Sequence, residues 1–327
     1  HKNLEDFIIE TPLENPLDFL NKQFDASLIK DVQTKWIPYD FKNQNIDDFL
    51  ENLNIDKTVE ISSIQGGYSN AIKQLNKFIE VGYQDYAKYR SDPSKEASSQ
   101  LSPYFHHGQI STHEVFDKIS ELESWSPESI NPKMVGRREG WWGSSENFES
   151  FMDELITWRE LGYHTCVRRA NYNQYSSLPE WAIKTLHEHS SDEREHIYSL
   201  DELTYSQTHD EIWNAAQNQL RTQGVIQNYL RMLWGKKILE WTPNPQIALS
   251  YMITLNDRYS LDGRDPNSYS GVFWILGRYD RAWGPERSIF GKIRYMTSDS
   301  TARKFNLKPY LEKWGNESLG VFTSISK

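Results

Sequence analysis

The sequence predicts an all-α protein, and three observations support this class. After residue 66, apolar residues recur at spacings of three and four along most segments, as they do on one face of a helix. Hardly any stretch alternates with a period of two over the length of a strand. Patterns that start helices occur repeatedly, among them Ser111 to Glu114 and Thr208 to Glu211, which have the spacing of a capping box.

Gly66 and Gly67 separate two regions of different character. Residues 1–65 are rich in Asn, Asp and Gln and are interrupted by proline, so we expect a mostly irregular lead-in with short helices at 26–34 and 45–53. Residues 66–327 are expected to form one helical domain, with a loop rich in Ser, Pro, Gly and Trp at 121–145. Its helices are expected at 68–90, from Ser111 past Ile119, at 146–168, near Trp181, from Thr208 to Gly224, and at 225–241, 244–255 and 266–275.

Composition limits the possible classes of function. The 327 residues carry 36 basic and 46 acidic side chains, and this net charge of −10 excludes nucleic-acid binding by bulk charge but allows a local basic groove. No apolar run approaches the roughly 20 residues of a membrane helix. Motifs for dinucleotides, nucleoside triphosphates, zinc proteases and serine hydrolases are absent from the sequence.

The start of the chain and its cysteine content bear on the cellular compartment of the protein. The chain starts with His1 and no signal peptide follows, so we expect a processed, truncated or tagged product. The single cysteine, Cys166, excludes a disulfide framework and four-cysteine zinc or iron–sulfur sites. An intracellular location is expected, cytoplasmic if the source is prokaryotic. His187, Glu188 and His189 favour a solvated helix end over a metal site, and no metal is expected.

Several residue patterns are candidates for a site, although each also has an ordinary structural interpretation. Ser98 to Ser102 supplies hydroxyls and backbone amides suited to phosphate, but many helix N-termini look alike. Trp234 and Trp241 lie seven apart on one expected helix, about 10 Å along its axis, and Trp213 lies on the preceding helix. These indoles either pass an electron hole in short steps or fill a core.

Polar residues beside apolar runs give further candidates. Glu154 and Trp158 form an i, i+4 pair that either binds a base or forms an amphipathic boundary. Arg231 and Asp262 either pair across helices or are solvated separately. Asn256, at the end of an apolar helix, needs a partner, which is either backbone or a ligand.

Six segments, in this order, resemble the flavin-binding catalytic half of class II DNA photolyases. They are SQLSPYFHHGQIS (99–111), YSLDEL (198–203), THDEIWNAAQ (208–217), YLRMLWGKKILEW (229–241), LNDRYSLDGRDPN (255–267) and FGKIRYM (290–296). The resemblance covers the run from about 66 to 314. It implies FAD held in a U shape by helices, and light-driven repair in which photoexcited reduced FAD passes an electron to a flipped cyclobutane pyrimidine dimer.

The resemblance also implies roles for individual residues. Arg231 and Asp262 would form a salt bridge beside the isoalloxazine, and Asn256 would face its N5. Trp234, Trp213 and Trp241 would be the photoreduction relay, with Trp234 nearest the flavin, and Glu154 would steady the dimer radical anion. The full set of expected flavin contacts is Tyr86, Ser98, Ser99, Leu101, Ser102, Arg159, Asn228, Arg231, Asn256, Asp262 and Asp265. The expected contacts to the dimer and to DNA are Glu154, Trp158, Met232, Trp274, Trp283, Lys292 and Arg294, with Arg303 and Lys304 as further basic candidates.

Departures from the family pattern leave alternatives open. The family begins with an antenna domain for which residues 1–65 are too short, so no antenna pigment is expected. Glu114 stands where the family has an arginine near the lesion, and the stretch Gly277 to Tyr279 is shortened. A cryptochrome-like photoreceptor without repair, repair of (6-4) photoproducts, and a nucleic-acid-binding relative without flavin are the alternatives. We expect a monomer that acts on UV-damaged DNA at the nucleoid and does not bind membranes.

Overall fold

The computed structural model describes residues 26–36, 45–137 and 139–316, and these form two units. The first unit reaches Glu60 and contains α2 (Ala26–Lys35) and α3 (Ile46–Glu51), close to the two short helices expected there. α3 begins at Asn45, whose side chain accepts a hydrogen bond from the backbone amide two residues later. Much of the expected irregular lead-in, including residues 1–25 and 37–44, lies outside the described residues.

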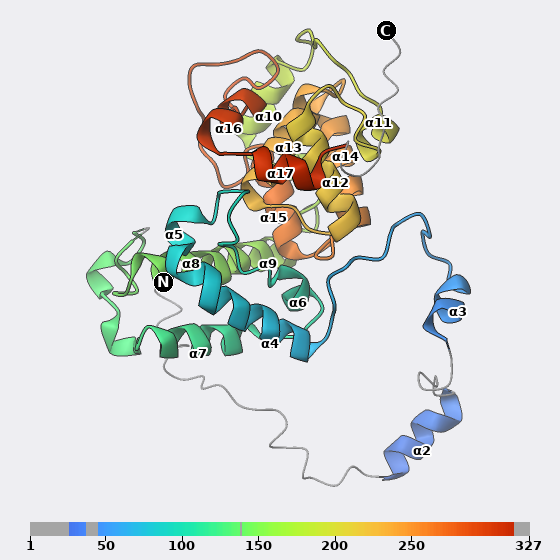
Figure 1. The fold of residues 1–327 in the computed structure, drawn as a ribbon. Helices are drawn as coiled ribbons and strands as arrows, with labels where there is room; N and C mark the ends of the chain where they lie inside the picture. Colours follow the sequence, from blue (N-terminus) through green and yellow to red (C-terminus); the bar gives the residue numbers. More distant parts are fainter. Residues whose placement is uncertain (1–25, 37–44, 138, 317–327) are drawn as a thin grey trace. The chain divides into compact units, whose positions relative to one another are not determined.

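The second unit, from Ile61 onward, is helical, and no strand occurs in the part of it that the structure describes (Figure 1). The expected all-α class is therefore confirmed. Its α-helices are α4 (Tyr68–Lys77), α5 (Tyr86–Tyr89), α6 (Ser102–His106), α7 (Thr112–Leu122), α8 (Glu146–Met152), α9 (Arg159–Arg168), α10 (Glu180–Glu188), α11 (Leu200–Thr204), α12 (Glu211–Gln223), α13 (Asn228–Glu240), α14 (Pro245–Tyr259), α15 (Pro266–Ile275), α16 (Ser298–Lys304) and α17 (Lys308–Trp314). Within the described ranges, no helix combines the length and the apolar composition needed to cross a membrane.

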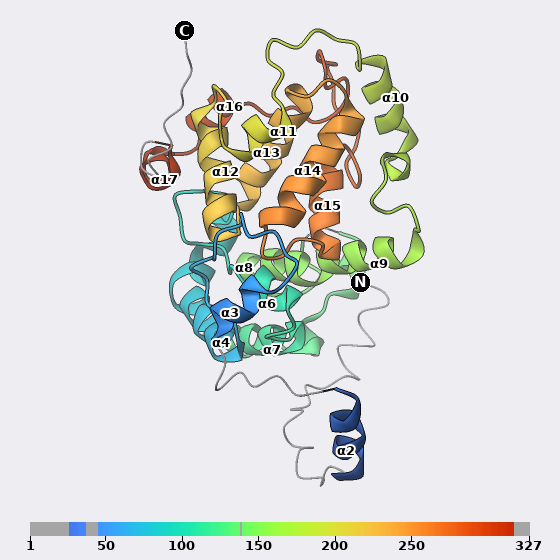
Figure 2. The same cartoon turned by 90° about the vertical axis from the view of Figure 1, so that its right-hand side faces the viewer.

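The helices of the second unit form two groups. Figures 1 and 2 show α4 to α9 together in one group and α12 to α15 at the centre of the other. α9 packs on α15, α12 packs on α13 and α17, and α14 packs on α13 and α15. Large side chains such as Trp213, Trp234 and Phe273 are almost completely buried among these central helices. The core therefore lies where the expected apolar faces of the central helices meet.

Two helices that the sequence predicts to be continuous contain a π-helical turn. The segment at 68–90 passes from α4 into a π-helix at Phe78–Gly82 before α5 begins, and the segment at 146–168 has a π-helix at Asp153–Trp158 (η6) between α8 and α9. A π-turn is a single wider turn, closed by a hydrogen bond between residues five apart. The spacing of apolar residues in the sequence does not reveal where one such turn interrupts an α-helix. Glu154 and Trp158 both lie in this π-turn, and the Trp158 indole donates to Asp153, five residues earlier, at 3.1 Å.

The expected capping boxes are only partly formed. Ser111 does cap α7 by accepting the amide hydrogen of Glu114 at 3.0 Å. The second bond of a capping box, in which the Glu114 carboxylate would accept the amide hydrogen of Ser111, is not made. The expected cap at Thr208 was wrong, because Asp210 caps α12. Thr208 instead donates its hydroxyl to Asn214 at 2.8 Å, and the charged Asp210 side chain accepts the amide hydrogen of Trp213 at 2.9 Å.

A buried carboxylate holds the stretch between α7 and α8, which the sequence predicts to be a loop. Glu149 is only 7% exposed and accepts the backbone amide hydrogens of Gly140 and Gly143. Gly143 has a φ of +65°, and a Cβ there would lie 2.0 Å from the carbonyl oxygen of Ser129, so this position requires glycine.

Candidate functional site

A cavity of about 660 Å³ lies in the second unit, and its walls come from both helix groups. This volume is within the roughly 300–1,000 Å³ typical of small-molecule sites. Segments that are far apart in the sequence meet here, from α5 to α15 and on to α17. The expected site residues that line it are Tyr86, Ser98, Ser99, Leu101, Ser102, Glu154, Trp158, Arg159, Asn228, Arg231, Met232, Asp262 and Trp274.

One wall of the cavity is the serine-rich turn that leads into α6. Ser98, Ser99 and Ser102 line the cavity, and the fully buried Leu101 anchors the turn in the core. The side chain of Gln74 on α4 donates to the carbonyl oxygen of Ser99 at 2.9 Å, which fixes the turn to a helix. Hydroxyl groups held in this way are suited to donate hydrogen bonds to phosphate oxygens.

The expected ion pair between Arg231 and Asp262 is present beside the cavity. A guanidinium nitrogen of Arg231 on α13 lies 3.7 Å from the Asp262 carboxylate, and the two side chains are 16% and 12% exposed. Burial alone would raise the pKa of Asp262, but the charge of Arg231 and the hydroxyls of Ser260 and Ser102 outweigh it, so the pKa lies below its ordinary value. The Asp262 carboxylate is thus charged at neutral pH and faces the Arg231 guanidinium at the cavity wall.

Glu154 has a partner that sequence reasoning missed. Its carboxylate forms an ion pair with Arg90, which directly follows α5 and also lines the cavity. The Arg90 guanidinium lies 5.8 Å from the ring centroid of Tyr86, another lining residue, whose pKa is raised by burial. Arg90 and Glu154 are 64 residues apart, so no local spacing could have paired them.

The indoles of Trp158 and Trp274 stack on one another at the cavity wall. Their ring centroids are 5.0 Å apart and their planes differ by 16°. The resemblance implies that both stack on a dimer, whereas in this structure each forms the stacking partner of the other. Tyr279, to which no sequence motif assigns a role, contacts Trp158 in a T-shaped arrangement with 6.3 Å between ring centroids.

Two expected flavin contacts do not line the cavity. Asn256 is 4% exposed and donates to the Asp257 carboxylate at 3.2 Å, so the partner that it needs is a side chain. Asp265 is 6% exposed, caps α15 by accepting the amide hydrogen of Asn267, and lies 3.3 Å from His106. These bonds account for the burial of both side chains, and their contacts to a flavin stay predictions.

Three expected contacts to the dimer and to DNA also lie outside the cavity lining. Trp283 donates its indole hydrogen to Asp280 at 3.0 Å, and the Arg294 guanidinium lies 5.1 Å from its ring centroid. Lys292 forms an ion pair with Glu286 at 3.1 Å. These residues belong to the segment that follows the turn after α15, so the structure groups Trp283 with Arg294 and leaves their role a prediction.

Trp234, Trp213 and Trp241 form a contiguous buried series. The indole of Trp213 donates to the backbone carbonyl of Trp234 at 3.0 Å, and its ring centroid is 5.7 Å from that of Trp241. The Trp234 indole donates to Gln217 at 2.9 Å. The Trp213 indole therefore touches the backbone of Trp234 and the ring of Trp241, and the relay through these residues stays a prediction.

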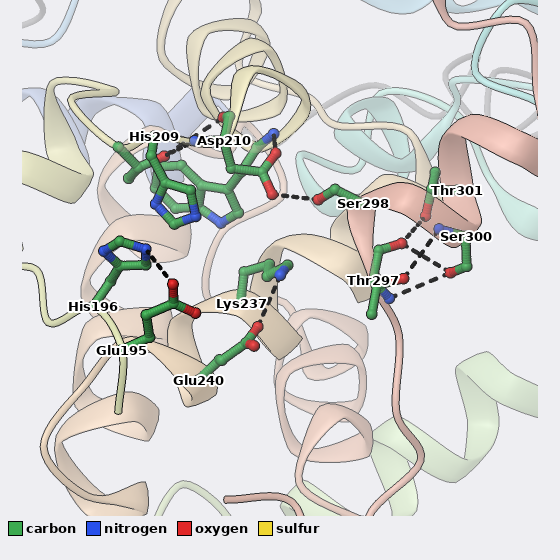
Figure 3. A network of polar contacts seen from close by, with 12 residues as sticks. Glu195, His196, His209, Asp210, Lys237, Glu240, Thr297, Ser298, Ser300 and Thr301 are labelled. Atoms are coloured by element: carbon green, nitrogen blue, oxygen red, sulfur yellow. Dashed lines mark hydrogen bonds and ion pairs between the residues drawn. The ribbon is translucent and has the colours of Figure 1, made fainter. Parts of the chain in front are cut away.

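The outer end of this series meets a second, polar cavity of about 430 Å³. Figure 3 shows His196, His209, Lys237 and Glu240 at this place, with the Lys237–Glu240 ion pair at 2.9 Å. The Lys237 ammonium lies 5.3 Å from the ring centroid of Trp241. Burial, aided by His196, lowers the pKa of His209, so its imidazole is neutral at pH 7. Trp241 is thus the member of the series with polar surroundings.

Comparisons with known proteins agree with this geometry. No protein-family model matches the sequence. The deoxyribodipyrimidine photo-lyase of Methanothermobacter thermautotrophicus is 40% identical over 267 residues, which are 82% of this chain and 55% of that protein. The protein of the same name from Potorous tridactylus is 38% identical over 263 residues, or 80% and 46% of the two chains. This chain belongs to the photolyase family.

The fold of the photolyase family is also found by comparison with solved structures. A bacterial class III photolyase from Agrobacterium tumefaciens matches with a TM-score of 0.55 and 17% identity, over 86% of this chain and 49% of that one. This photolyase-family chain spans about half the length of the curated relatives that it matches.

The histidine-rich stretch near α10 of this photolyase-family chain is explained by local pairing. His189 lies 2.6 Å from the Asp192 carboxylate and 3.8 Å from that of Glu286. In the described ranges, no group of three or more His, Cys, Asp and Glu side chains has an arrangement that could hold a metal ion.

Proposed function

We propose that this chain holds FAD in the 660 Å³ cavity and uses light to split cyclobutane pyrimidine dimers in DNA. The observation that carries the proposal is that one cavity is lined by both kinds of residue that the reaction needs. Hydroxyls and an ion pair suited to the cofactor share it with a carboxylate and two indoles suited to a base.

The side chains around the cavity fit an FAD. The hydroxyls of Ser98, Ser99 and Ser102 are suited to the diphosphate, and Arg159 lines the same cavity. Arg231 and Asp262 place one fixed positive and one fixed negative group where a flavin ring edge, which carries hydrogen-bond donors and acceptors, can meet both. The buried Asp262 keeps its charge because Arg231 and two hydroxyls compensate it, so the pair is formed before a cofactor binds.

The chemistry that a bound, fully reduced flavin supplies is light-driven donation of one electron to the dimer and its return after the ring opens. Glu154 would accept a hydrogen bond from a pyrimidine N–H, and Arg90 would hold that carboxylate in place. Trp158, Trp274 and Met232 would give an apolar surface that stacks on the flipped lesion and excludes water. Lys292 and Arg294 would contact DNA phosphates.

The three buried indoles would supply electrons that bring the flavin to its reduced state. Trp234 would donate first, Trp213 would refill Trp234, and Trp241 would refill Trp213, as the contacts through Trp213 allow. Trp241 lies beside the polar cavity, where a positive charge on an indole is better solvated than in the core. This gradient favours movement of the hole away from the flavin.

The decisive experiment is illumination of the reduced protein with a single-stranded oligonucleotide that contains one cyclobutane dimer, followed by product analysis. We expect restored adjacent pyrimidines and a yellow protein that releases FAD on denaturation. Glu154→Gln should lower the repair yield and spare FAD content, whereas Glu146→Gln, at an exposed position on the preceding helix, should change neither. A folded, colourless protein that takes up no flavin would refute the proposal.

The same experiment separates the alternatives. A protein that binds FAD and photoreduces it but releases no repaired base would be a photoreceptor of the cryptochrome kind. Turnover of an oligonucleotide with a (6-4) photoproduct in place of the dimer would identify that lesion as the substrate. Class II membership, a monomeric state, an intracellular location at the nucleoid and the absence of an antenna pigment stay predictions that belong to this proposal.

A further inference from the structure

Tyr279 has a backbone conformation that bulky residues rarely adopt. It lies in the turn that follows α15, with a φ of +63°, in the left-handed region that favours glycine. A residue keeps such a backbone conformation only where surrounding contacts hold it, and residues of this kind cluster at functional sites. The contacts of this turn and of the Tyr279 side chain therefore indicate what the strained conformation achieves.

The turn is fixed by contacts on the side away from the cavity. Arg278 is 5% exposed, its guanidinium lies 3.8 Å from the ring centroid of Phe273, and it donates to the carbonyl oxygen of Tyr172 at 2.8 Å and to the hydroxyl of Ser177. A Cβ at Gly277 would lie 2.9 Å from Trp181, so the chain runs in close contact with α10. Because these contacts hold Gly277 and Arg278, the chain directs Tyr279 back toward the cavity, which Tyr279 lines.

The side chain of Tyr279 connects α9 to the aromatic wall of the cavity. Its hydroxyl shares a hydrogen bond with the Thr165 hydroxyl and donates to the carbonyl oxygen of Leu161 at 3.3 Å, both on α9. Its ring meets Trp158 with planes 66° apart, while the other neighbour of Trp158 is Trp274, stacked at 5.0 Å. Trp158 is therefore held on two sides.

We propose that Tyr279 is a positioning residue for the dimer, acting through Trp158. This inference rests on the proposed function and deepens it. Trp158 lies in the π-helical turn η6, whose widened geometry leaves it without the regular packing of an α-helix. Tyr279, pinned to α9, keeps Trp158 parallel to Trp274, so that the stacked pair offers one outer ring face to the lesion. An edge-to-face pair of this kind is worth about 0.5–1.5 kcal/mol, which corresponds to a change in affinity of about 2- to 12-fold.

Three variants test this role. Tyr279→Gly removes the ring and suits the positive φ, Tyr279→Phe keeps the ring and loses the hydroxyl, and Thr165→Val removes the bonding partner on α9 but keeps its shape. The first readout is the exciton-coupled circular dichroism of the Trp158–Trp274 stack, measured as the difference between the unmodified protein and Trp158→Phe. The second is KM against kcat for repair of the dimer oligonucleotide by reduced protein.

We expect Tyr279→Gly to lose this dichroism and to raise KM about 2- to 12-fold with kcat unchanged, and Tyr279→Phe and Thr165→Val to show smaller changes in the same direction. An unaltered dichroism and KM in Tyr279→Gly would overturn the proposal. If Tyr279→Gly does not fold, Thr165→Val decides by the same two readouts. If the unmodified protein repairs no dimer, the proposed function fails, whereas the dichroism still shows whether Tyr279 positions Trp158.

Discussion

Replacing Arg231 by methionine should lower the free energy of unfolding by about 3 kcal/mol, because Asp262 would stay buried without its partner. At the observed 3.7 Å, two unit charges interact by about 4.5 kcal/mol at an effective dielectric constant of about 20. Removing one partner of a buried pair costs about 3–5 kcal/mol. We expect the lower end because the hydroxyls of Ser260 and Ser102 continue to stabilise the Asp262 carboxylate.

Urea unfolding of the flavin-loaded Arg231→Met protein in the dark measures the loss in the free energy of unfolding. The same substitution should lower the thermal midpoint by about 6–12 °C. The double variant Arg231→Met with Asp262→Asn removes both charges and should recover more than half of the stability. Arg303→Met, at an exposed position on α16, is the control and should change the stability little. If the double variant loses the sum of the two single losses, the two side chains are not coupled and the reasoning fails.

Three further outcomes are expected. Trp234→Phe should slow blue-light photoreduction of FAD but spare repair by chemically reduced protein, and unchanged photoreduction kinetics would contradict the relay. Burial lowers the pKa of Lys236 to about 7 from 10.5, so between these values the unfolded chain binds more protons and the free energy of unfolding rises with pH. Lys236→Met should flatten that rise in urea titrations at several pH values, and an identical slope would refute the shift. Glu149→Gln should cost about 1.5–3 kcal/mol and speed proteolysis between α7 and α8, whereas equal cleavage rates would show that Glu149 does not hold this stretch.

Local patterns in the sequence predict the helical class and most of the central helices. The apolar faces of α12 to α14 repeat at helical spacing, and Gly224 and Pro245 mark boundaries where the structure has them. α13 starts three residues later than expected, because Gln227 caps it with its side chain. The short helices α16 and α17 were not expected, since helices of seven residues carry little periodic signal and depend on tertiary packing.

The candidate site is predictable only where it depends on motifs. Arg231 and Asp262 carry opposite charges beside apolar helices, so their pairing could be expected from the sequence. Arg90 could not be matched to Glu154, because the pair forms across 64 residues through a π-turn that apolar spacing does not show. The sequence marks Tyr279 only as part of a shortened stretch, since its contact with Trp158 depends on a left-handed turn held by other elements.

The position of α17 has a consequence for how the protein matures in the cell. Tyr310 donates its hydroxyl to Gln219 on α12 at 2.7 Å, and both Tyr310 and Trp314 form part of the cavity wall. Because these residues leave the ribosome after every other segment that surrounds the cavity, a nascent chain has an open, incomplete chamber until residue 314 has been translated and released. A molecule held in this chamber can therefore be enclosed only once α17 has packed against α12.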